Sequence, residues 1–226
     1  MIRDIYRKTE IDNRSANLKL VLDKANKIHD MSKESKNRLY SWHVPEVECI
    51  AKGKVSKPYE FGCKVSVATN LHSAPGGHFI LQAQALHGRP YDGHTLNAAI
   101  EYIRSLSGKT PKRIFVDKGY IGHNYAEKHH VFRSGQKRGV TAHLKREIKR
   151  RSVIEPIIGH AKNEGHLGLN WLKGQEGDRI NACLSAVGFN FRQILAWLRL
   201  LLQFLYLYFM SAMDNKSSKK FLRSYA

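Results

Sequence analysis

The order of hydrophobic patterns between residues 59 and 117 limits the possible folds more than any other feature of this sequence. In YEFGCKVSVA, residues 59–68, apolar side chains alternate with others, which is the period of a strand with one buried face. HFILQAQAL, residues 78–86, predicts a second strand, joined to the first by a hairpin or short loop rich in Asn, Ser, Pro and Gly. Apolar residues at helical spacing over 96–106 predict a helix, and KRIFVD, residues 112–117, predicts a buried strand. This order indicates an α/β fold in which the helix crosses one face of a mixed sheet.

Helical patterns flank this unit on both sides. Residues 1–50 are rich in charge and carry leucine and alanine at helical spacing, which predicts a polar helical segment. Residues 51–205 hold the strands and two further helices, predicted over 143–163 and from about 178 to 209. Residues 206–226 are predicted to form a flexible basic tail.

The most apolar stretch of the chain is ILAWLRLLLQFLYLYFM, residues 194–210. Its 17 residues reach only the lower limit for a membrane-spanning helix, and Arg199 and Gln203 lie within it. We therefore predict a helix that is buried or forms an oligomer, and no association with a membrane. A basic protein anchored in a membrane by this segment is the alternative.

The charge of the chain indicates a polyanionic partner. The sequence has 38 Lys and Arg against 19 Asp and Glu, a formal net charge of +19. Such an excess is typical of nucleic-acid-binding domains, because each Lys or Arg side chain that neutralises a phosphate releases counterions. Between residues 104 and 151 there are 14 basic and three acidic residues, an excess of 14 − 3 = +11.

The cysteines and histidines do not indicate a metal-stabilised or secreted domain. Cys49, Cys63 and Cys183 are far apart and form no CxxC pair, which argues against a disulfide framework or a zinc ribbon and fits a reducing cytoplasm. The 12 histidines are scattered and give little support to a structural zinc site.

Two carboxylates within or beside this basic region are candidates for chemistry. Asp117 stands at the end of the predicted strand. Arg151, Glu155 and Lys162 follow the spacing R-x3-E-x6-K, which at about 100° per residue places them on one helical face. A carboxylate there can bind a divalent cation while the two bases hold phosphate oxygens, as phosphoryl transfer requires.

Structural explanations fit the same residues. Arg151 and Glu155 can form an ordinary surface pair, and Ser152 with Glu155 matches a helix capping box. Asp117 before Lys-Gly can simply form a turn. Asp92, a further candidate acid, precedes a helical pattern and is better explained as its N-cap.

Four motifs resemble one protein family in the same order. FVDKGY (115–120) and RRSVIEPIIGHAK (150–162), with KPYEFGCKVSVAT (57–69) and GRPYDGHTL (88–96), resemble the catalytic half of a bacterial insertion-sequence transposase of the DDE type. The resemblance runs from about residue 39 to about 202. It implies an RNase-H-like mixed sheet flanked by helices, DNA as substrate, and Mg²⁺ or Mn²⁺ as cofactor.

The resemblance also implies roles for single residues. Asp117 matches the second catalytic aspartate and Glu155 the catalytic glutamate, and both would bind the metal. Arg151 and Lys162 match two positions of the family's Y-R-E-K signature, whereas Ile148 stands where its tyrosine is expected. The candidate DNA-binding residues are Arg151, Lys162, Lys118, His160, Trp171 and Lys173. His160 is equally well explained as a surface histidine.

The first aspartate of the family has no counterpart here. It belongs on a strand that precedes KPYEFGCKVSVAT, but the aspartates in that part of the chain lie in polar helical sequence: Asp4, Asp12, Asp23 and Asp30. Residues 1–50 resemble the remnant of an insertion that follows the missing strand. We therefore expect an N-terminally truncated chain, incomplete at that strand, with little or no strand-transfer activity.

The predicted function is that of a DNA transposase core, truncated and weakly active or inactive. Its chemistry is phosphodiester hydrolysis at element ends followed by strand transfer from the 3′-OH. A non-catalytic DNA-binding or oligomerising fragment that regulates full-length transposase is the alternative. The expected partners are double-stranded DNA and either further copies of the chain or full-length transposase, in the cytoplasm at the nucleoid.

Overall fold

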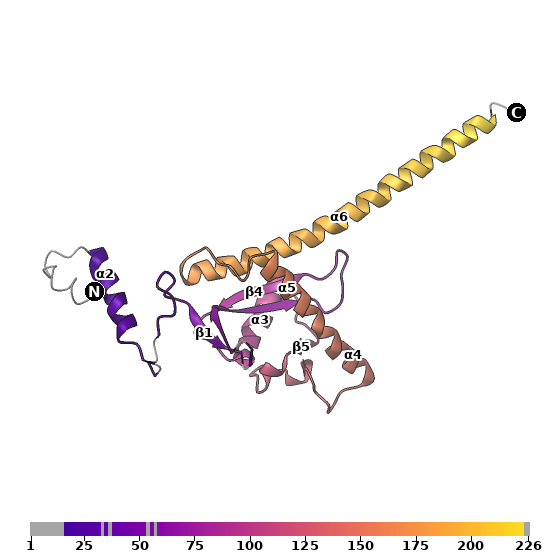
Figure 1. The fold of residues 1–226 in the computed structure, drawn as a ribbon. Helices are drawn as coiled ribbons and strands as arrows, with labels where there is room; N and C mark the ends of the chain where they lie inside the picture. The colour runs from indigo at the N-terminus through magenta and orange to yellow at the C-terminus, as the bar shows by residue number, and fades with distance from the viewer. Residues whose placement is uncertain (1–15, 33, 36–37, 53–54, 57, 224–226) are drawn as a thin grey trace.

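Figure 1 shows the computed structural model of the chain, which describes residues 16–32, 34–35, 38–52, 55–56 and 58–223. The helices are α2 (Ala16–His29), α3 (Asp92–Ser107), α4 (Ala142–Arg150), α5 (Ile154–Asn163) and α6 (Gly174–Arg223). The strands are β1 (Glu48–Ala51), β2 (Tyr59–Gly62), β3 (Lys64–Thr69), β4 (Ile80–Leu86), β5 (Ile114–Val116) and β6 (Val131–Arg133). Single 3₁₀ turns cover Lys118–Tyr120, Lys128–His130 and Arg151–Val153.

The described strands form three two-stranded sheets. β1 pairs with β2 and β3 pairs with β4, both antiparallel, whereas β5 and β6 run parallel. Phe115 lies opposite Phe132 in the parallel pair, and their rings stack with centroids 5.4 Å apart. The α/β class is confirmed. The single mixed sheet is not formed among the described strands, so the RNase-H-like arrangement stays a prediction.

One of the predicted strands is in fact two. The alternating segment 59–68 breaks at Gly62, whose φ of +140° is a conformation that glycine adopts far more readily than other residues. Before the break β2 pairs with β1, and after it β3 pairs with β4. The alternation of apolar residues continues unchanged across the break, so the pattern alone does not show that the segment forms two strands. The second strand and the hairpin to it are confirmed.

Helix α3 forms where its apolar spacing predicted it, but it begins differently. The residue at the N-cap is Tyr91, without a side-chain capping bond, so the prediction that Asp92 caps the helix is wrong. The Asp92 carboxylate instead pairs with the Lys64 ammonium on β3, and Thr95 Oγ1 donates to the Asp92 carbonyl at 2.7 Å. Gly108 ends the helix in the left-handed conformation, with φ of +66°.

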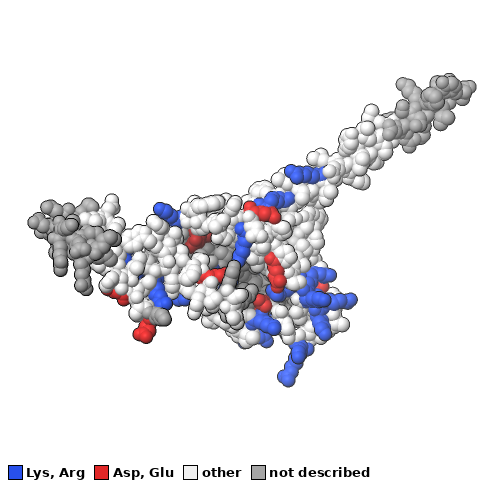
Figure 2. All heavy atoms as spheres, in the orientation of Figure 1, with Lys and Arg blue, Asp and Glu red and all other residues white. Residues whose placement is uncertain are grey.

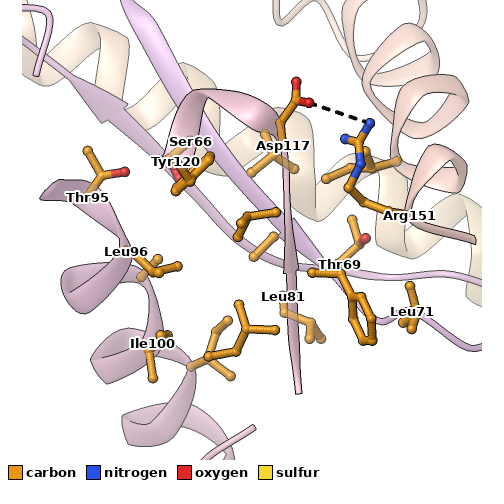
Figure 3. A pocket seen from close by; sticks show the side chains of 18 of the residues that line it. Ser66, Thr69, Leu71, Leu81, Thr95, Leu96, Ile100, Asp117, Tyr120 and Arg151 are labelled. Carbon is orange, nitrogen blue, oxygen red and sulfur yellow. Dashed lines mark ion pairs between the residues drawn. The ribbon is translucent and has the colours of Figure 1, made fainter. Parts of the chain in front are cut away.

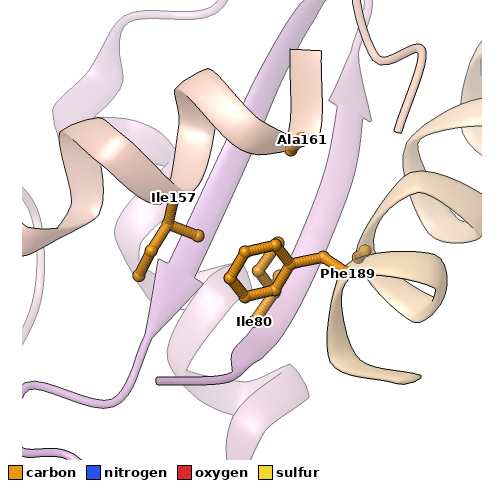
Figure 4. Close-up of a cluster of buried hydrophobic side chains, with 5 residues drawn as sticks. Ile80, Ile157, Ala161 and Phe189 are labelled. Carbon is orange, nitrogen blue, oxygen red and sulfur yellow. The ribbon is translucent and has the colours of Figure 1, made fainter. Parts of the chain in front are cut away.

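Two hydrophobic clusters hold these elements together. In the first, Leu96 and Ile100 of α3 pack with Val116 of β5 and Val131 of β6. This packing buries Val116 and fixes the position of Asp117, which follows it. The second cluster joins β4, α5 and α6 through Ile80, Ile157, Ala161 and Phe189 (Figure 4).

Asn190 adds a polar connection between α6 and the start of β4. Its Nδ2 donates to the Ile80 carbonyl at 2.9 Å, and its Oδ1 accepts from the Ile80 N–H at 2.8 Å. One side chain thus satisfies both backbone groups of a buried strand residue, which fixes the helix against the strand.

The predicted helix over 143–163 is confirmed as α4, a 3₁₀ turn and α5 in succession. Thr141 caps α4 by accepting from the Leu144 N–H at 3.3 Å. The capping box at Ser152 is wrong, because Ser152 lies inside the 3₁₀ turn and α5 starts without a side-chain capping bond. The backbone stays right-handed helical through Arg150, Arg151 and Val153, so Glu155 continues a helical run.

Helix α6 is longer than predicted, at 50 residues, and extends through the segment predicted as a flexible tail. Its first half packs on β4 and α5, while its second half projects away from the body of the molecule (Figure 1). Residues 194–211 are all exposed. Of the two predicted alternatives, burial within one chain is therefore wrong, and a helix that forms an oligomer stays a prediction. Over 174–211 the helix is long and apolar enough to cross a membrane.

Candidate active site

Asp117 stands at the C-terminal end of β5 and turns its carboxylate outward. The side chain is 64% exposed. Its Oδ1 accepts from the Lys118 N–H at 2.7 Å and so starts the 3₁₀ turn that follows the strand. The turn-forming explanation is therefore correct for one oxygen, while the carboxylate as a whole stays open to a ligand.

Glu155 approaches the same place from the first turn of α5. Arg151 lies one turn earlier, and its Nη2 is 3.5 Å from Glu155 Oε1 and 3.9 Å from Asp117 Oδ1. The guanidinium side chain is only 19% exposed, whereas that of Glu155 is 69% exposed. The partly buried guanidinium of Arg151 thus lies near two exposed carboxylates, those of Asp117 and Glu155, which come from separate elements.

A cavity of about 470 Å³ opens beside this group (Figure 3). Asp117 and Arg151 stand at one end of it, and apolar side chains such as Leu96, Ile100 and Leu81 line its depth. Its polar mouth and apolar interior suit a binding site that excludes water from part of its ligand.

The walls of this cavity include strand edges. Every residue from 64 to 71 and from 113 to 117 lines it, whereas a cavity over one face of a sheet would be lined by alternate residues. β3 and β5 therefore each present an edge to the cavity, and neither edge is paired in the part of the chain that the structure describes.

Two further polar side chains of the cavity wall, Asp92 and Tyr120, interact with other residues of the wall. Asp92 is paired with Lys64, which also donates to the Pro90 carbonyl at 2.9 Å. Burial raises the pKa of Tyr120 above its ordinary value; a hydrogen bond with Thr95 opposes this rise, and the charge of Asp92 adds to it. The phenol thus stays protonated at neutral pH.

A buried ion-pair network supports the helix that carries Arg151. Glu147 of α4 is 4% exposed. Its Oε1 accepts from Arg150 Nη1 at 2.7 Å, and its Oε2 lies 2.7 Å from His72 Nε2 in the β3–β4 loop. Sequence reasoning missed this network, because no spacing rule connects residues 75 positions apart.

The other predicted DNA-binding residues are exposed but do not gather around Asp117. His160 Nδ1 lies 2.6 Å from Glu164 Oε1, so its nearest acidic neighbour is not Glu155. Trp171 is 75% exposed, with its ring 5.1 Å from that of His166. Lys118, Lys162 and Lys173 are exposed as well. Apart from the backbone N–H of Lys118, which donates to Asp117 Oδ1, no hydrogen bond or ion pair among the described residues joins them to Asp117 or Glu155.

The pair Asp117 and Glu155 fits a hard divalent cation by its chemistry. Carboxylate oxygens are the ligands that Mg²⁺ prefers, and the guanidinium of Arg151 already shows that a cation is held between the two groups. Within the described residues, however, no third His, Cys, Asp or Glu converges with them, since the one group of three metal-binding side chains is Cys63, His87 and Asp178 elsewhere. Sequence reasoning missed that group too, because its three residues are far apart along the chain and follow no metal-binding motif.

Comparison with known proteins assigns the chain to a family. The model of the Transposase DDE domain matches residues 40–188, which is most of the chain and includes Asp117, Arg151 and Glu155. Searches of curated proteins and of solved structures found no match. Members of the matched family bind DNA and typically use a divalent metal. The chain, with its two carboxylates at the edge of an α/β core, belongs to the DDE transposase family.

Proposed function

We propose that this chain is the core of a DNA transposase that hydrolyses a phosphodiester at element ends. The freed 3′-OH then attacks a phosphodiester of the target DNA, forms a new phosphodiester with it and displaces a target 3′-OH. The observation that carries the proposal is the convergence of Asp117 and Glu155 on the Arg151 guanidinium. Both acids lie within the matched domain, at the open end of a strand and on the helix beside it.

In this proposal Asp117 and Glu155 hold Mg²⁺ or Mn²⁺. Such a cation, when bound, polarises the attacking water or hydroxyl and stabilises the leaving oxygen of an in-line displacement. Arg151 orients the two carboxylates and balances their charge until DNA arrives.

DNA is held by the basic surface around these residues. Lys and Arg side chains gather over α4, next to the helix that carries Glu155 (Figure 2). Lys118 and Lys162 supply further charge near the two acids along the chain, and exposed Trp171 offers a face on which an unpaired base can stack. Exposed His160 and Lys173 are, in this proposal, further contacts to the phosphate backbone.

We further propose that this polypeptide alone is weakly active or inactive. A displacement by two cations needs more than two carboxylates to hold them. Of the aspartates that precede β2, Asp23 lies on α2 and Asp30 directly after it, on no strand, while Asp4 and Asp12 lie outside the described residues. The unpaired edges of β3 and β5 would accept a further strand between them, and a carboxylate at its end would complete the site.

The test is a cleavage assay with purified chain, the DNA that flanks its gene, and Mg²⁺ or Mn²⁺. We expect salt-dependent DNA binding in a mobility-shift assay, and cleavage at element ends that is weak or undetectable. Any cleavage should disappear in Asp117→Asn and Glu155→Gln but persist in Glu164→Gln. Strong cleavage would contradict the requirement for a further carboxylate, and cleavage that survives both substitutions would contradict the site.

A regulatory, non-catalytic role is the second candidate, favoured by the exposed apolar half of α6. A chain that binds element ends and pairs with full-length transposase would inhibit it by forming mixed assemblies. Titrating the chain, and separately a variant ending at residue 193, into an active transposase reaction distinguishes the two candidates. Inhibition that requires residues 194–223 would support regulation.

A further inference from the structure

A second group of polar side chains lies outside the cavity beside Asp117. Cys63 stands between β2 and β3, His87 follows β4, and Asp178 lies near the start of α6. One ligand atom from each lies within 4.8 Å of the other two, the only such group of three in the described part of the chain. None of the three lines the cavity.

The spacing of these atoms is that of ligands around an ion. Cys63 Sγ lies 3.7 Å from Nδ1 and 3.8 Å from Nε2 of His87, and His87 Nε2 lies 3.7 Å from Asp178 Oδ2. The nitrogen–oxygen distance is too long for a hydrogen bond. Around tetrahedral Zn²⁺, with bonds of about 2.3 Å to sulfur and about 2.0–2.1 Å to nitrogen, sulfur and nitrogen lie about 3.6 Å apart and nitrogen and oxygen about 3.4 Å. A rotation of the imidazole ring and small shifts would close the remaining gap.

The surroundings hold two of these side chains in place. Asn170 Nδ2 donates to Asp178 Oδ1 at 2.8 Å, which leaves Oδ2 free to face His87. Such a bond to the outer oxygen of a carboxylate is the usual support of a metal ligand. The side chains of His87 and Asp178 are only 13% and 20% exposed, so bulk water competes little for the position between them.

Glu48 places a further buried carboxylate oxygen beside the neighbours of Cys63 and His87, outside the group of three ligand atoms. It lies opposite Gly62 in the β1–β2 register, next to Cys63, and its Oε1 accepts from the Gly88 N–H at 2.6 Å, next to His87. Its Oε2 is buried and accepts no hydrogen bond from the described residues. The nearest cationic atom paired with it is Arg89 Nε at 4.0 Å. A buried carboxylate oxygen in this state is costly unless it meets a cation.

We propose that Cys63, His87 and Asp178 bind Zn²⁺. A thiolate together with an imidazole selects zinc over Mg²⁺ or Ca²⁺, which prefer oxygen ligands only. Three protein ligands would leave the fourth position of the tetrahedron to water. Its ligands come from the connection between β2 and β3, the end of β4 and the start of α6, so a bound ion would join these elements.

Cobalt substitution tests this site directly. The chain is stripped with a chelator and titrated with Co²⁺, then with Zn²⁺. We expect a near-ultraviolet absorption band from thiolate coordination that saturates at one Co²⁺ per chain, and loss of that band when one equivalent of Zn²⁺ is added. Cys63→Ser should abolish the band, while Cys183→Ser, which removes an exposed cysteine, should keep it.

Two further variants keep the result interpretable. Asn170→Ala leaves all ligands in place and should weaken Zn²⁺ binding about 10- to 100-fold, so it tests the site even if Cys63→Ser fails to fold. Asp117→Asn should leave Zn²⁺ affinity unchanged, which separates this site from the proposed active site. No cobalt band in the wild-type chain, a band that persists in Cys63→Ser, or unchanged affinity in folded Asn170→Ala would overturn the proposal.

Discussion

The arrangement of the two acidic residues depends on one guanidinium. Ion pairs between exposed groups contribute little to stability, and both carboxylates paired with Arg151 are largely exposed. The contribution of Arg151 is therefore orientation, for which the planar fork of arginine is better suited than the ammonium of lysine.

Glu147 illustrates the opposite case, a carboxylate whose partners stabilise the fold. Glu147→Gln should lower the free energy of unfolding by about 1–2 kcal/mol, because the buried group loses its charge-assisted bonds to Arg150 and His72. The expected loss of stability is small because the side chains of both partners are partly exposed to solvent. Urea denaturation measures it, with Glu101→Gln at an exposed pair as the control. Equal effects of the two substitutions would contradict the importance of burial.

Tyr120 should make stability depend on pH in the alkaline range. Its pKa is raised in the folded chain, so its contribution to stability is full below the ordinary value of about 10 and is lost as pH rises through the raised value. Tyr120→Phe should therefore lose less stability than the wild type above about pH 10. Urea denaturation across this range checks the difference, and exposed Tyr102→Phe serves as the control. Parallel curves for wild type and Tyr120→Phe would refute the prediction.

The sequence revealed some of these residues and concealed others for a physical reason. Asp117 and Glu155 could be predicted because each belongs to a local motif, one at a strand end and one at helical spacing. The contact between Glu147 and His72 depends on how a hairpin loop meets a helix, and no local pattern encodes that. The same holds for Cys63 and His87, which meet only because β3 and β4 pair.

At the scale of elements, periodic patterns predicted which helices and strands are present better than they predicted where each one begins and ends. The spacing over 96–106 located α3, but tertiary contacts replaced the expected cap when Asp92 paired with Lys64. Alternation located β3, but the break at Gly62 follows from a backbone angle that alternation does not record. The pairing of strands into separate sheets likewise lies beyond one-dimensional patterns.

Where α6 packs on β4, replacing a side chain by alanine should be tolerated only on the exposed face of the helix. Phe189→Ala should lower the free energy of unfolding by about 3–5 kcal/mol, because its ring is 3% exposed between β4 and α5. Phe191→Ala, two residues later and 60% exposed, should change it by less than about 0.5 kcal/mol. Thermal or urea unfolding of both variants compares them. A similar loss for Phe191→Ala would mean that α6 packs on the core through a different face.

At the scale of the whole molecule, the second half of α6 needs a partner. Residues 194–211 are exposed on all sides, and a continuous apolar surface of this extent marks an interaction site. Arg199 and Gln203 within it favour packing against a second copy over insertion into lipid. This preference is a prediction from the sequence, which the fold of one chain leaves open.

Sedimentation velocity tests the predicted self-association. The wild-type chain should sediment as a dimer or larger assembly, and the double substitution Leu198→Glu and Leu205→Glu should shift it to the monomer, because charged side chains cannot be buried unpaired in an apolar interface. Lys173→Glu outside this segment serves as the control. A monomeric wild-type chain, or one recovered only with membranes, would contradict the prediction.

The most direct test of the proposed active site is Mn²⁺ binding by the chain with excess Zn²⁺ removed, followed by electron paramagnetic resonance. We predict that the wild-type chain binds Mn²⁺, that Asp117→Asn and Glu155→Gln each weaken binding by at least about tenfold, and that Glu164→Gln leaves it unchanged. Mn²⁺ binding that is equally strong in all four proteins would show that Asp117 and Glu155 do not form the metal site.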